Sequence, residues 1–143
     1  MRGAMPALDS SHFPLWLAQA LTAAFFAVLF LQSGLDKVFD WKGNLGWLTG
    51  HFAKSPLRGV VTPMLAAITL LEVAAGLVSA VGLAKLLASG ETRVALYGVM
   101  LAGVALLSLF FGQRLAKDYP GAGALVPYFL VVLAGLMLLR ASA

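Results

Sequence analysis

Residues 60–83 read VVTPMLAAITLLEVAAGLVSAVGL and contain a single ionisable side chain, Glu72. A transmembrane helix needs about 20 mostly apolar residues, because the hydrocarbon core of a bilayer is about 30 Å thick and a helix rises about 1.5 Å per residue. This stretch has that length, and Arg58 and Lys85 flank it. It therefore predicts a helix that crosses a membrane.

Three further stretches have the length or composition of membrane-crossing helices. They are residues 14–35, 94–111 and 125–139. The first is too long for the apolar part of a cleaved signal peptide, so we expect it to be retained. Pro14 and Pro63 suit first helical turns, where a missing N–H is not needed. The sequence thus predicts an all-α integral membrane four-helix bundle, with residues 1–143 as a single transmembrane domain.

The longest connection, residues 36–57, predicts a short segment in the membrane interface between the first two crossings. Trp41 and Trp47 belong to a residue type that gathers at the bilayer surface. The glycines of this segment are Gly43, Gly46 and Gly50. Because glycine weakens a helix, we expect the segment to be broken or re-entrant.

The composition fits a chain embedded in lipid. Of 143 residues, 61% are hydrophobic and 11% are charged, whereas about 25% charged residues is usual in a soluble domain. The net charge of +4 comes from single basic residues between apolar runs. Nucleic-acid binding needs a basic face with several phosphate contacts. We therefore expect the lipid bilayer as a partner, and no nucleic acid.

The residue types that hold metals or perform catalysis are sparse. The chain has no cysteine, which excludes iron–sulfur ligation and c-type haem attachment. His12 precedes the first crossing and His51 follows it, so we expect them on opposite membrane faces, too far apart to ligate one iron. We predict no metal, no covalently bound cofactor and no catalytic residue in this chain.

Glu72 is the residue that most strongly suggests a functional site. Roughly 20 Å of helix separates it from either flank of its crossing, which places it near the bilayer midplane. A charged residue there costs about 2.5–3.5 kcal/mol and often marks function. Small or polar residues share its helix face: Thr69, Gly76, Ser79 and Gly82. Two interpretations stay open, a carboxyl that only locks two helices together and a contact for a quinone, a proton or a substrate.

Lys37, at the end of the first crossing, carries the charge opposite to that of Glu72. If the second crossing starts level with Lys37, Glu72 lies about 18 Å deeper, which is more than two extended side chains span. We therefore expect an uncharged Glu72, because desolvation disfavours the charged form. Its expected hydrogen-bond partner is Thr22 or Gln19 of the first crossing.

Two short motifs resemble those of DoxX-like membrane proteins. GLDK supplies the G-x-x-K pattern with Gly34 and Lys37, and EVAAG supplies the E-x-x-x-G pattern with Glu72 and Gly76, followed by Gly82. The resemblance implies a multi-pass protein of the bacterial cytoplasmic (inner) membrane, tied to respiratory or quinone-linked electron transport. The three glycines are expected at helix contacts, since small residues let membrane helices approach closely.

Three function classes remain open. The first is a non-catalytic accessory subunit of a respiratory or quinone-linked redox complex, with other membrane subunits as partners. The second is an oxidoreductase subunit that itself contacts quinone, with the quinone or proton contact at Glu72, Lys37, Gln19 and Thr22. The third is a small proton or solute transporter that uses Glu72.

Overall fold

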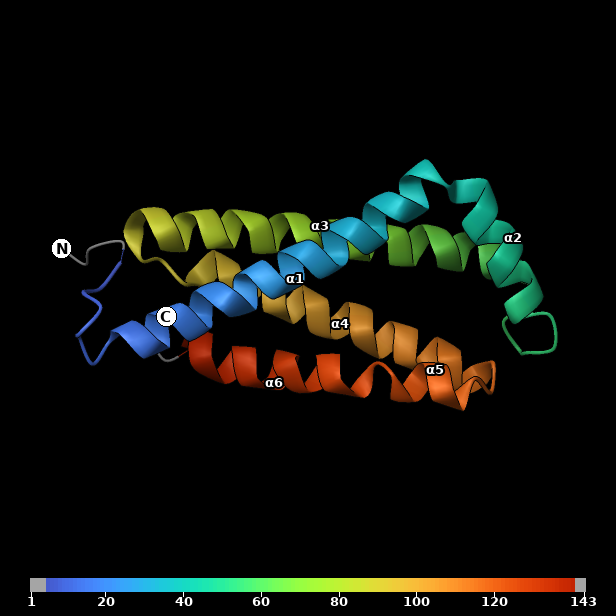
Figure 1. The fold of residues 1–143 in the computed structure, drawn as a ribbon. Coiled ribbons are helices and arrows are strands. Elements are labelled where there is room, and N and C mark those ends of the chain that lie inside the picture. Colours follow the sequence, from blue (N-terminus) through green and yellow to red (C-terminus); the bar gives the residue numbers. More distant parts are fainter. Residues whose placement is uncertain (1–4, 141–143) are drawn as a thin grey trace.

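The computed structural model describes residues 5–140, and Figure 1 shows them as a bundle of long helices. The helices are α1 (Phe13–Phe39), α2 (Trp41–His51), α3 (Val61–Ser89), α4 (Arg93–Leu115), α5 (Tyr119–Gly123) and α6 (Val126–Arg140). Four segments are long and apolar enough to cross a bilayer: α1, α3, α4 and the combined α5–α6 segment Tyr119–Arg140. The prediction of an all-α, multi-pass membrane bundle is confirmed, and no strand occurs within residues 5–140.

Successive crossings lie side by side, with α1 against α3, α3 against α4 and α4 against α6. α1 crosses the bundle obliquely (Figure 1), meeting α6 near Thr22 and α3 near Gly34. Phe26 and Phe30 of α1 fill the centre, together with Leu106 of α4 and other apolar side chains. The oblique path of α1 sets which of its polar residues can reach α3.

Glycines lie where helices cross most closely. A Cβ atom built on Gly34 would lie 2.8 Å from Val73 Cγ2, and one on Gly76 would lie 2.6 Å from the backbone nitrogen of Leu31. A Cβ on Gly82 would overlap the backbone of Ala95 in α4. The three glycines that the sequence assigned to helix packing are therefore all at helix crossings, where a larger side chain would force the helices apart.

The helices extend beyond the apolar runs that predicted them. α1 ends at Phe39 rather than residue 35, α3 at Ser89 rather than residue 83, and α4 at Leu115 rather than residue 111. A helix can continue past its apolar run because long basic side chains such as Lys85 reach outward along it. α3 stops at Gly90, whose φ of 76° is left-handed and whose N–H donates to the carbonyl of Leu86.

The expectation of a broken or re-entrant segment between the first two crossings was wrong, because α2 is a continuous helix of 11 residues. Asp40 caps its start by accepting a hydrogen bond from the Gly43 N–H at 3.3 Å. Gly46 and Gly50 face open space. α2 contacts α1 and α3. These contacts, together with the Asp40 cap, offset the low helix propensity of the glycines.

Candidate functional site

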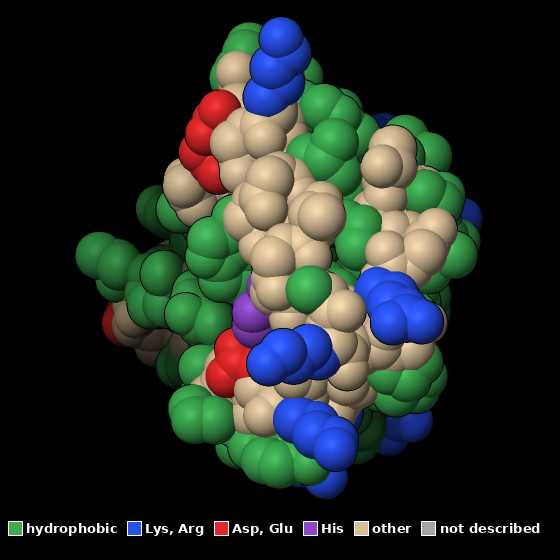
Figure 2. All heavy atoms as spheres, turned by 90° about the vertical axis from the view of Figure 1, so that its right-hand side faces the viewer, with side chains coloured by type: hydrophobic (Ala, Val, Ile, Leu, Met, Phe, Trp, Pro, Cys, Tyr) green, Lys and Arg blue, Asp and Glu red, His purple; other side chains and the backbone are tan. Residues whose placement is uncertain are grey.

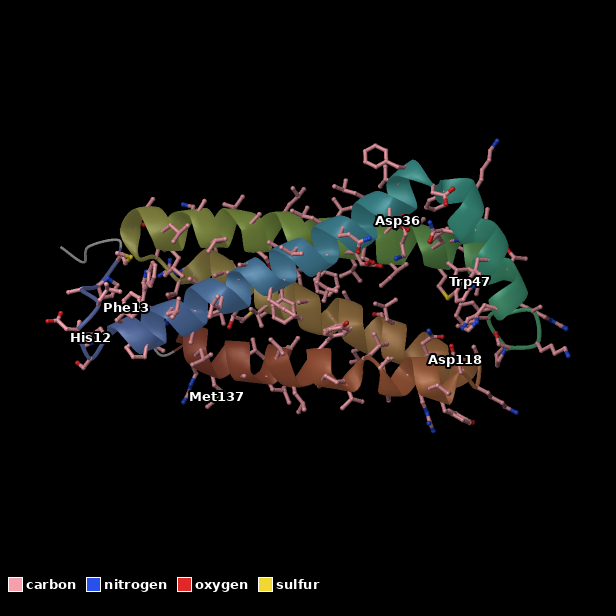
Figure 3. All side chains as sticks on the ribbon, in the orientation of Figure 1. His12, Phe13, Asp36, Trp47, Asp118 and Met137 are labelled. Carbon is pink, nitrogen blue, oxygen red and sulfur yellow. The ribbon has the colours of Figure 1, made fainter. Side chains whose placement is uncertain are left out.

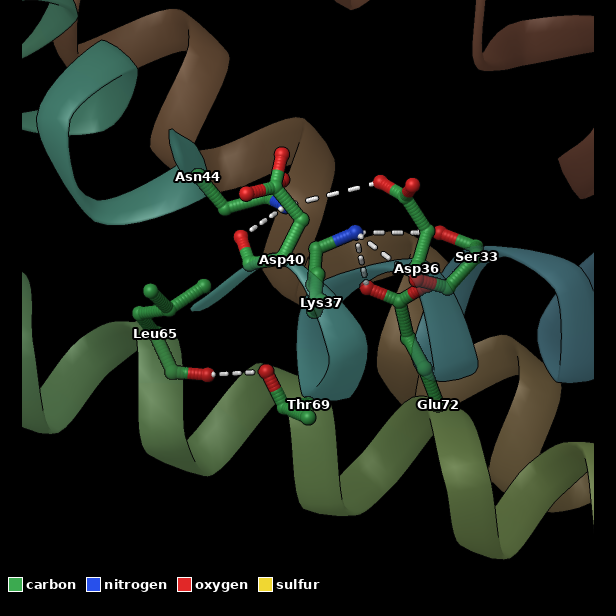
Figure 4. A network of polar contacts seen from close by, with 8 residues as sticks. All are labelled: Ser33, Asp36, Lys37, Asp40, Asn44, Leu65, Thr69 and Glu72. Carbon is green, nitrogen blue, oxygen red and sulfur yellow. Dashed lines mark hydrogen bonds and ion pairs between the residues drawn. The ribbon is translucent and has the colours of Figure 1, made fainter. Parts of the chain in front are cut away.

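A buried ion pair joins α1 to α3. Lys37 Nζ lies 3.1 Å from Glu72 Oε1 (Figure 4), and the Glu72 side chain is fully buried while that of Lys37 is 16% exposed. Lys37 also donates to Ser33 Oγ at 3.0 Å and lies 3.5 Å from the Ser33 carbonyl. Three oxygens therefore surround an ammonium that has three N–H donors.

The second carboxylate oxygen of Glu72, Oε2, has no hydrogen-bond partner among the described residues and is shielded from solvent. Thr69, one turn earlier on α3, donates its hydroxyl to the carbonyl of Leu65 at 2.7 Å (Figure 4) and does not serve Glu72. A buried polar atom without a partner costs free energy. Such an atom in a native site calls for an explanation, of which an absent ligand or water is one.

The expected contacts of Glu72 with Thr22 or Gln19 were wrong. Thr22 donates its hydroxyl to the carbonyl of Ala18 in its own helix at 2.7 Å. Gln19 donates to the carbonyl of Leu138 in α6 at 3.0 Å. Both side chains are buried, but they hold α1 to itself and to α6 and lie well away from the ion pair along α1. The partner of Glu72 is Lys37 instead.

The depth argument against Lys37 failed because α1 and α3 do not start and end at the same level. Gly34 lies opposite Val73, and Gly76 lies opposite Leu31, so Lys37 lies about level with residue 70 of α3. The first residues of α3, which begins at Val61, extend about 14 Å beyond that level. α2 lies beside these first turns (Figure 1), so α1 ends short of the level at which α3 begins.

Polar residues around the α1–α2 corner lead from the ion pair toward the exposed end of the bundle. Asn44 of α2 donates to Asp36 Oδ2 at 3.4 Å and to the carbonyl of Asp40 at 2.9 Å (Figure 4). Asp36 and Asp40 are exposed. The corner therefore holds α2 in place and gives the Lys37 side of the ion pair a polar surrounding.

A second polar cluster lies at the same end of the bundle, and sequence reasoning missed it. His51 Nε2 lies 2.7 Å from Gln113 Oε1 and 3.7 Å from Asp118 Oδ2. Trp47 stacks on the His51 ring, with centroids 4.6 Å apart. Nothing in the local sequence signals these contacts, because the residues come from connections far apart in the chain. The cluster joins the end of α2 to the α4–α5 turn.

This end of the bundle is also rich in basic side chains, and Figure 2 shows them gathered on one face with a histidine among them. The exposed basic residues of α2 and the adjoining connections are Lys42, Lys54, Arg58, Arg114 and Lys117. Within the described residues, the other end has Lys85, Arg93 and Arg140.

No group of three or more His, Cys, Asp or Glu side chains able to hold a metal occurs within residues 5–140. His12 lies at one end of the bundle, whereas Trp47, one turn from His51, and Asp118 lie at the other (Figure 3). The expected separation of the two histidines is therefore found.

An apolar groove of about 180 Å³ lies between α4 and α6. Its walls include Leu106, Phe110 and Phe129, and two further lining residues, Leu107 and Leu130, are exposed at the surface. Gly98 of α4 lies opposite Ser79 of α3, and the two helices run in opposite directions. Leu106, at the start of the groove, is therefore at about the depth of Glu72. It has almost no polar surface, so it does not by itself identify a ligand.

Comparisons of this chain with protein-family models, with curated proteins and with solved structures found no match. The DoxX-like resemblance therefore stays a prediction based on the GLDK and EVAAG motifs.

Proposed function

We propose that this chain is a non-catalytic subunit of a respiratory or quinone-linked redox complex, and that the Lys37–Glu72 pair is its contact for a quinone head group. The observation that carries the proposal is Glu72 Oε2, a fully buried carboxylate oxygen without a hydrogen-bond partner among the described residues, beside a lysine ammonium. Ionisable groups at such depth are costly to insert and usually mark a functional site.

The two side chains match the chemistry of a quinone in both of its redox forms. A quinone carbonyl accepts hydrogen bonds, and the Lys37 ammonium is a donor. A hydroquinone hydroxyl donates, and the free Glu72 oxygen is an acceptor. Because Lys37 is partly exposed, the pair is open at its ammonium end. Electrons would come from cofactor-bearing partner subunits, and this chain would position the head group.

The packing supports a quinone contact over a transport path. A path for protons or solutes would have to reach both faces of the membrane from Glu72. Beyond Glu72, toward the α3–α4 turn, a Cβ built on Gly98 would lie 2.5 Å from Ser79 Oγ, and Gly82 contacts Ala95 even more closely. These contacts show that α3 and α4 pack closely on this side of Glu72. The exposed part of the ion pair is the Lys37 ammonium, near the α1–α2 corner, which suits a head-group contact better than a path across the membrane.

The resemblance to DoxX-like proteins supports the same proposal and adds its location, the bacterial cytoplasmic membrane. Lys37 and Glu72 belong to the two motifs that carry the resemblance. Gly34 and Gly76, the other motif residues, hold α1 and α3 close enough for the ion pair to form. The four motif positions thus make up one structural unit.

The test is purification at native expression in a mild detergent, followed by mass spectrometry of co-eluting proteins and quinones. Wild type is compared with Glu72→Gln and with a control variant, Glu91→Gln. Glu91 forms an exposed ion pair with Lys85. We expect cofactor-bearing subunits to co-elute in fixed ratio with all three proteins. Bound quinone per chain should fall about tenfold in Glu72→Gln alone, since one lost charge-assisted hydrogen bond is worth about 1.5–3 kcal/mol.

Three other results would contradict the proposal in different ways. Co-elution of the redox subunits without quinone would leave an accessory subunit and reject the quinone contact. Elution without any cofactor-bearing subunit would reject the assignment to a redox complex. Proton or solute flux through vesicles containing the purified chain, abolished by Glu72→Gln, would favour a transporter.

A further inference from the structure

Gln32 is an exposed carboxamide on a membrane-crossing helix. From the contacts of Gly34 and Gly76 it lies about opposite Ala75 of α3, which is about 21 Å along the helix from either end of α3. No hydrogen bond or other polar contact of its side chain is found among the described residues. A carboxamide has two N–H donors and a carbonyl acceptor, and lipid at this depth can satisfy none of them.

The exposed residues around Gln32 follow one regular pattern along α1. They are Leu21, Phe25, Val28, Gln32, Leu35 and Phe39, all exposed. The steps between them alternate between four and three, which is the a/d spacing of a helix that pairs with another helix. Apolar residues facing lipid say little by themselves. The informative feature is the polar residue at an a position, since such residues set the register of helix pairs.

We propose that this chain forms a parallel homodimer through the exposed face of α1, with the two Gln32 side chains hydrogen-bonded to each other. Two copies with the same membrane orientation are related by a two-fold axis along the membrane normal, so each residue meets its own copy at the same depth. A carboxamide is both donor and acceptor, so two of them satisfy each other. A different protein would need its own polar group at the same depth.

The exposed face of α3 and the part of α4 around Ser108 lack this signal. Ser108 of α4 is exposed, but its hydroxyl donates to the carbonyl of Val104 in its own helix at 2.8 Å. The exposed face of α3 around Leu70, Leu77 and Val81 is apolar. These two faces can contact lipid without an unsatisfied amide, whereas the α1 face cannot. The inference is independent of the proposed quinone contact.

The first test uses cysteine cross-linking, for which the natural chain is suited because it has no cysteine. Val28→Cys and Leu35→Cys place thiols on either side of Gln32, and Leu77→Cys places one at similar depth on the exposed face of α3. Oxidation in native membranes should yield dimers of this chain about tenfold more readily at positions 28 and 35, because disulfides need Cα atoms within about 7 Å. Equal cross-linking at position 77, or cross-links to a different protein, would overturn the homodimer.

The second test measures the dimer equilibrium in liposomes by single-molecule photobleaching. Gln32→Leu should weaken dimerisation about threefold to thirtyfold, the range expected for interhelical hydrogen bonds of about 0.6–2 kcal/mol. Gln32→Asn retains the amide and should lose less. Leucine inserts into lipid more readily than glutamine, so failed insertion would not explain the loss. Dimerisation of Gln32→Leu equal to wild type would reject the role of the amide.

Discussion

Two lysine–glutamate ion pairs in this chain differ in almost everything except their chemistry. Lys37 and Glu72 come from two crossing helices and lie 3.1 Å apart, with the glutamate fully buried. Lys85 and Glu91 lie 3.7 Å apart at the α3–α4 turn, with their side chains 49% and 41% exposed. Helix packing brings the first pair together, whereas the residues of the second pair are only six positions apart in the sequence.

The difference teaches that the environment, and not the pairing of charges, sets the value of an ion pair. Exposed pairs contribute about 0–1 kcal/mol, because water and salt screen them. Breaking a buried pair costs about 3–5 kcal/mol, yet replacing both partners by apolar residues is often neutral or stabilising. Stability alone therefore does not explain a buried pair, which is a reason to look for its function in the membrane.

The largest expected effect is that of Lys37→Met, which leaves the Glu72 carboxylate without its counter-charge. We expect the free energy of unfolding to fall by about 3–5 kcal/mol. Denaturant titration of the protein in bicelles measures it. Lys85→Met is the matched control at the exposed pair and should change the value by less than about 1 kcal/mol. Equal losses at the two sites would remove the distinction between the pairs.

Lys37→Met combined with Glu72→Leu then separates a lock between helices from a ligand contact. With both charges gone, stability should return to within about 1 kcal/mol of wild type or exceed it. The quinone proposal expects this stable protein to purify without quinone. Retention of quinone by the double variant would leave the pair with a structural role only.

The next largest effect is expected where the helices that carry the buried pair cross. Gly76→Val places side-chain atoms against the backbone of Leu31, and overpacking of this kind costs about 1–3 kcal/mol. Gly46 of α2 faces open space, so Gly46→Ala should instead raise stability by about 0.5–1 kcal/mol. The same titration measures both. Unchanged stability of Gly76→Val would mean that α1 and α3 approach less closely than the 2.6 Å separation from Leu31 indicates.

A smaller effect is expected for Ser33→Ala, which removes the hydroxyl that accepts from Lys37 but leaves the ion pair. We expect a loss of about 1 kcal/mol. Ser89→Ala is its counterpart near the exposed pair, because Ser89 donates to the carbonyl of Lys85 at 3.0 Å on an exposed surface. Thermal unfolding followed by tryptophan fluorescence should show a lower Tm for Ser33→Ala and almost no change in Tm for Ser89→Ala.

The smallest effect is expected for Glu91→Gln, which breaks the exposed pair. The loss should be below about 0.5 kcal/mol and should shrink further in high salt. Unfolding titrations at low and high ionic strength check this. A loss larger than that of Ser33→Ala, or one independent of salt, would show that the α3–α4 turn is less accessible to water than its exposed side chains indicate.

Most of the fold could be predicted from the sequence because a bilayer imposes a simple requirement on it. Apolar runs of sufficient length are visible without knowledge of any tertiary contact. The same logic identified Glu72, since one acid inside such a run stands out. Helix ends were less predictable, because α1 and α3 continue past their apolar runs to Phe39 and Ser89.

The partner of Glu72 could not be predicted, because it depends on how two helices are offset along their axes. The sequence shows that Lys37 ends the first apolar run but not that α2 folds beside the first turns of α3. Without that offset, the expected separation of Lys37 from Glu72 along the helix axis is too large by about 14 Å. The contact of His51 with Asp118 was out of reach for a similar reason, since it joins two connections separated by two crossings.

The offset between the end of α1 and the start of α3 also has a consequence for the insertion of the chain into the membrane. Lys37 is synthesised about 35 residues before Glu72, which corresponds to about 2–7 s at 5–20 residues per second. During that interval its ammonium lacks the Glu72 carboxylate, and a lysine near the bilayer centre costs about 2.5–3.5 kcal/mol. We therefore expect the nascent α1 to lie at a shallower position, with Lys37 among the lipid headgroups, until α3 inserts beside it.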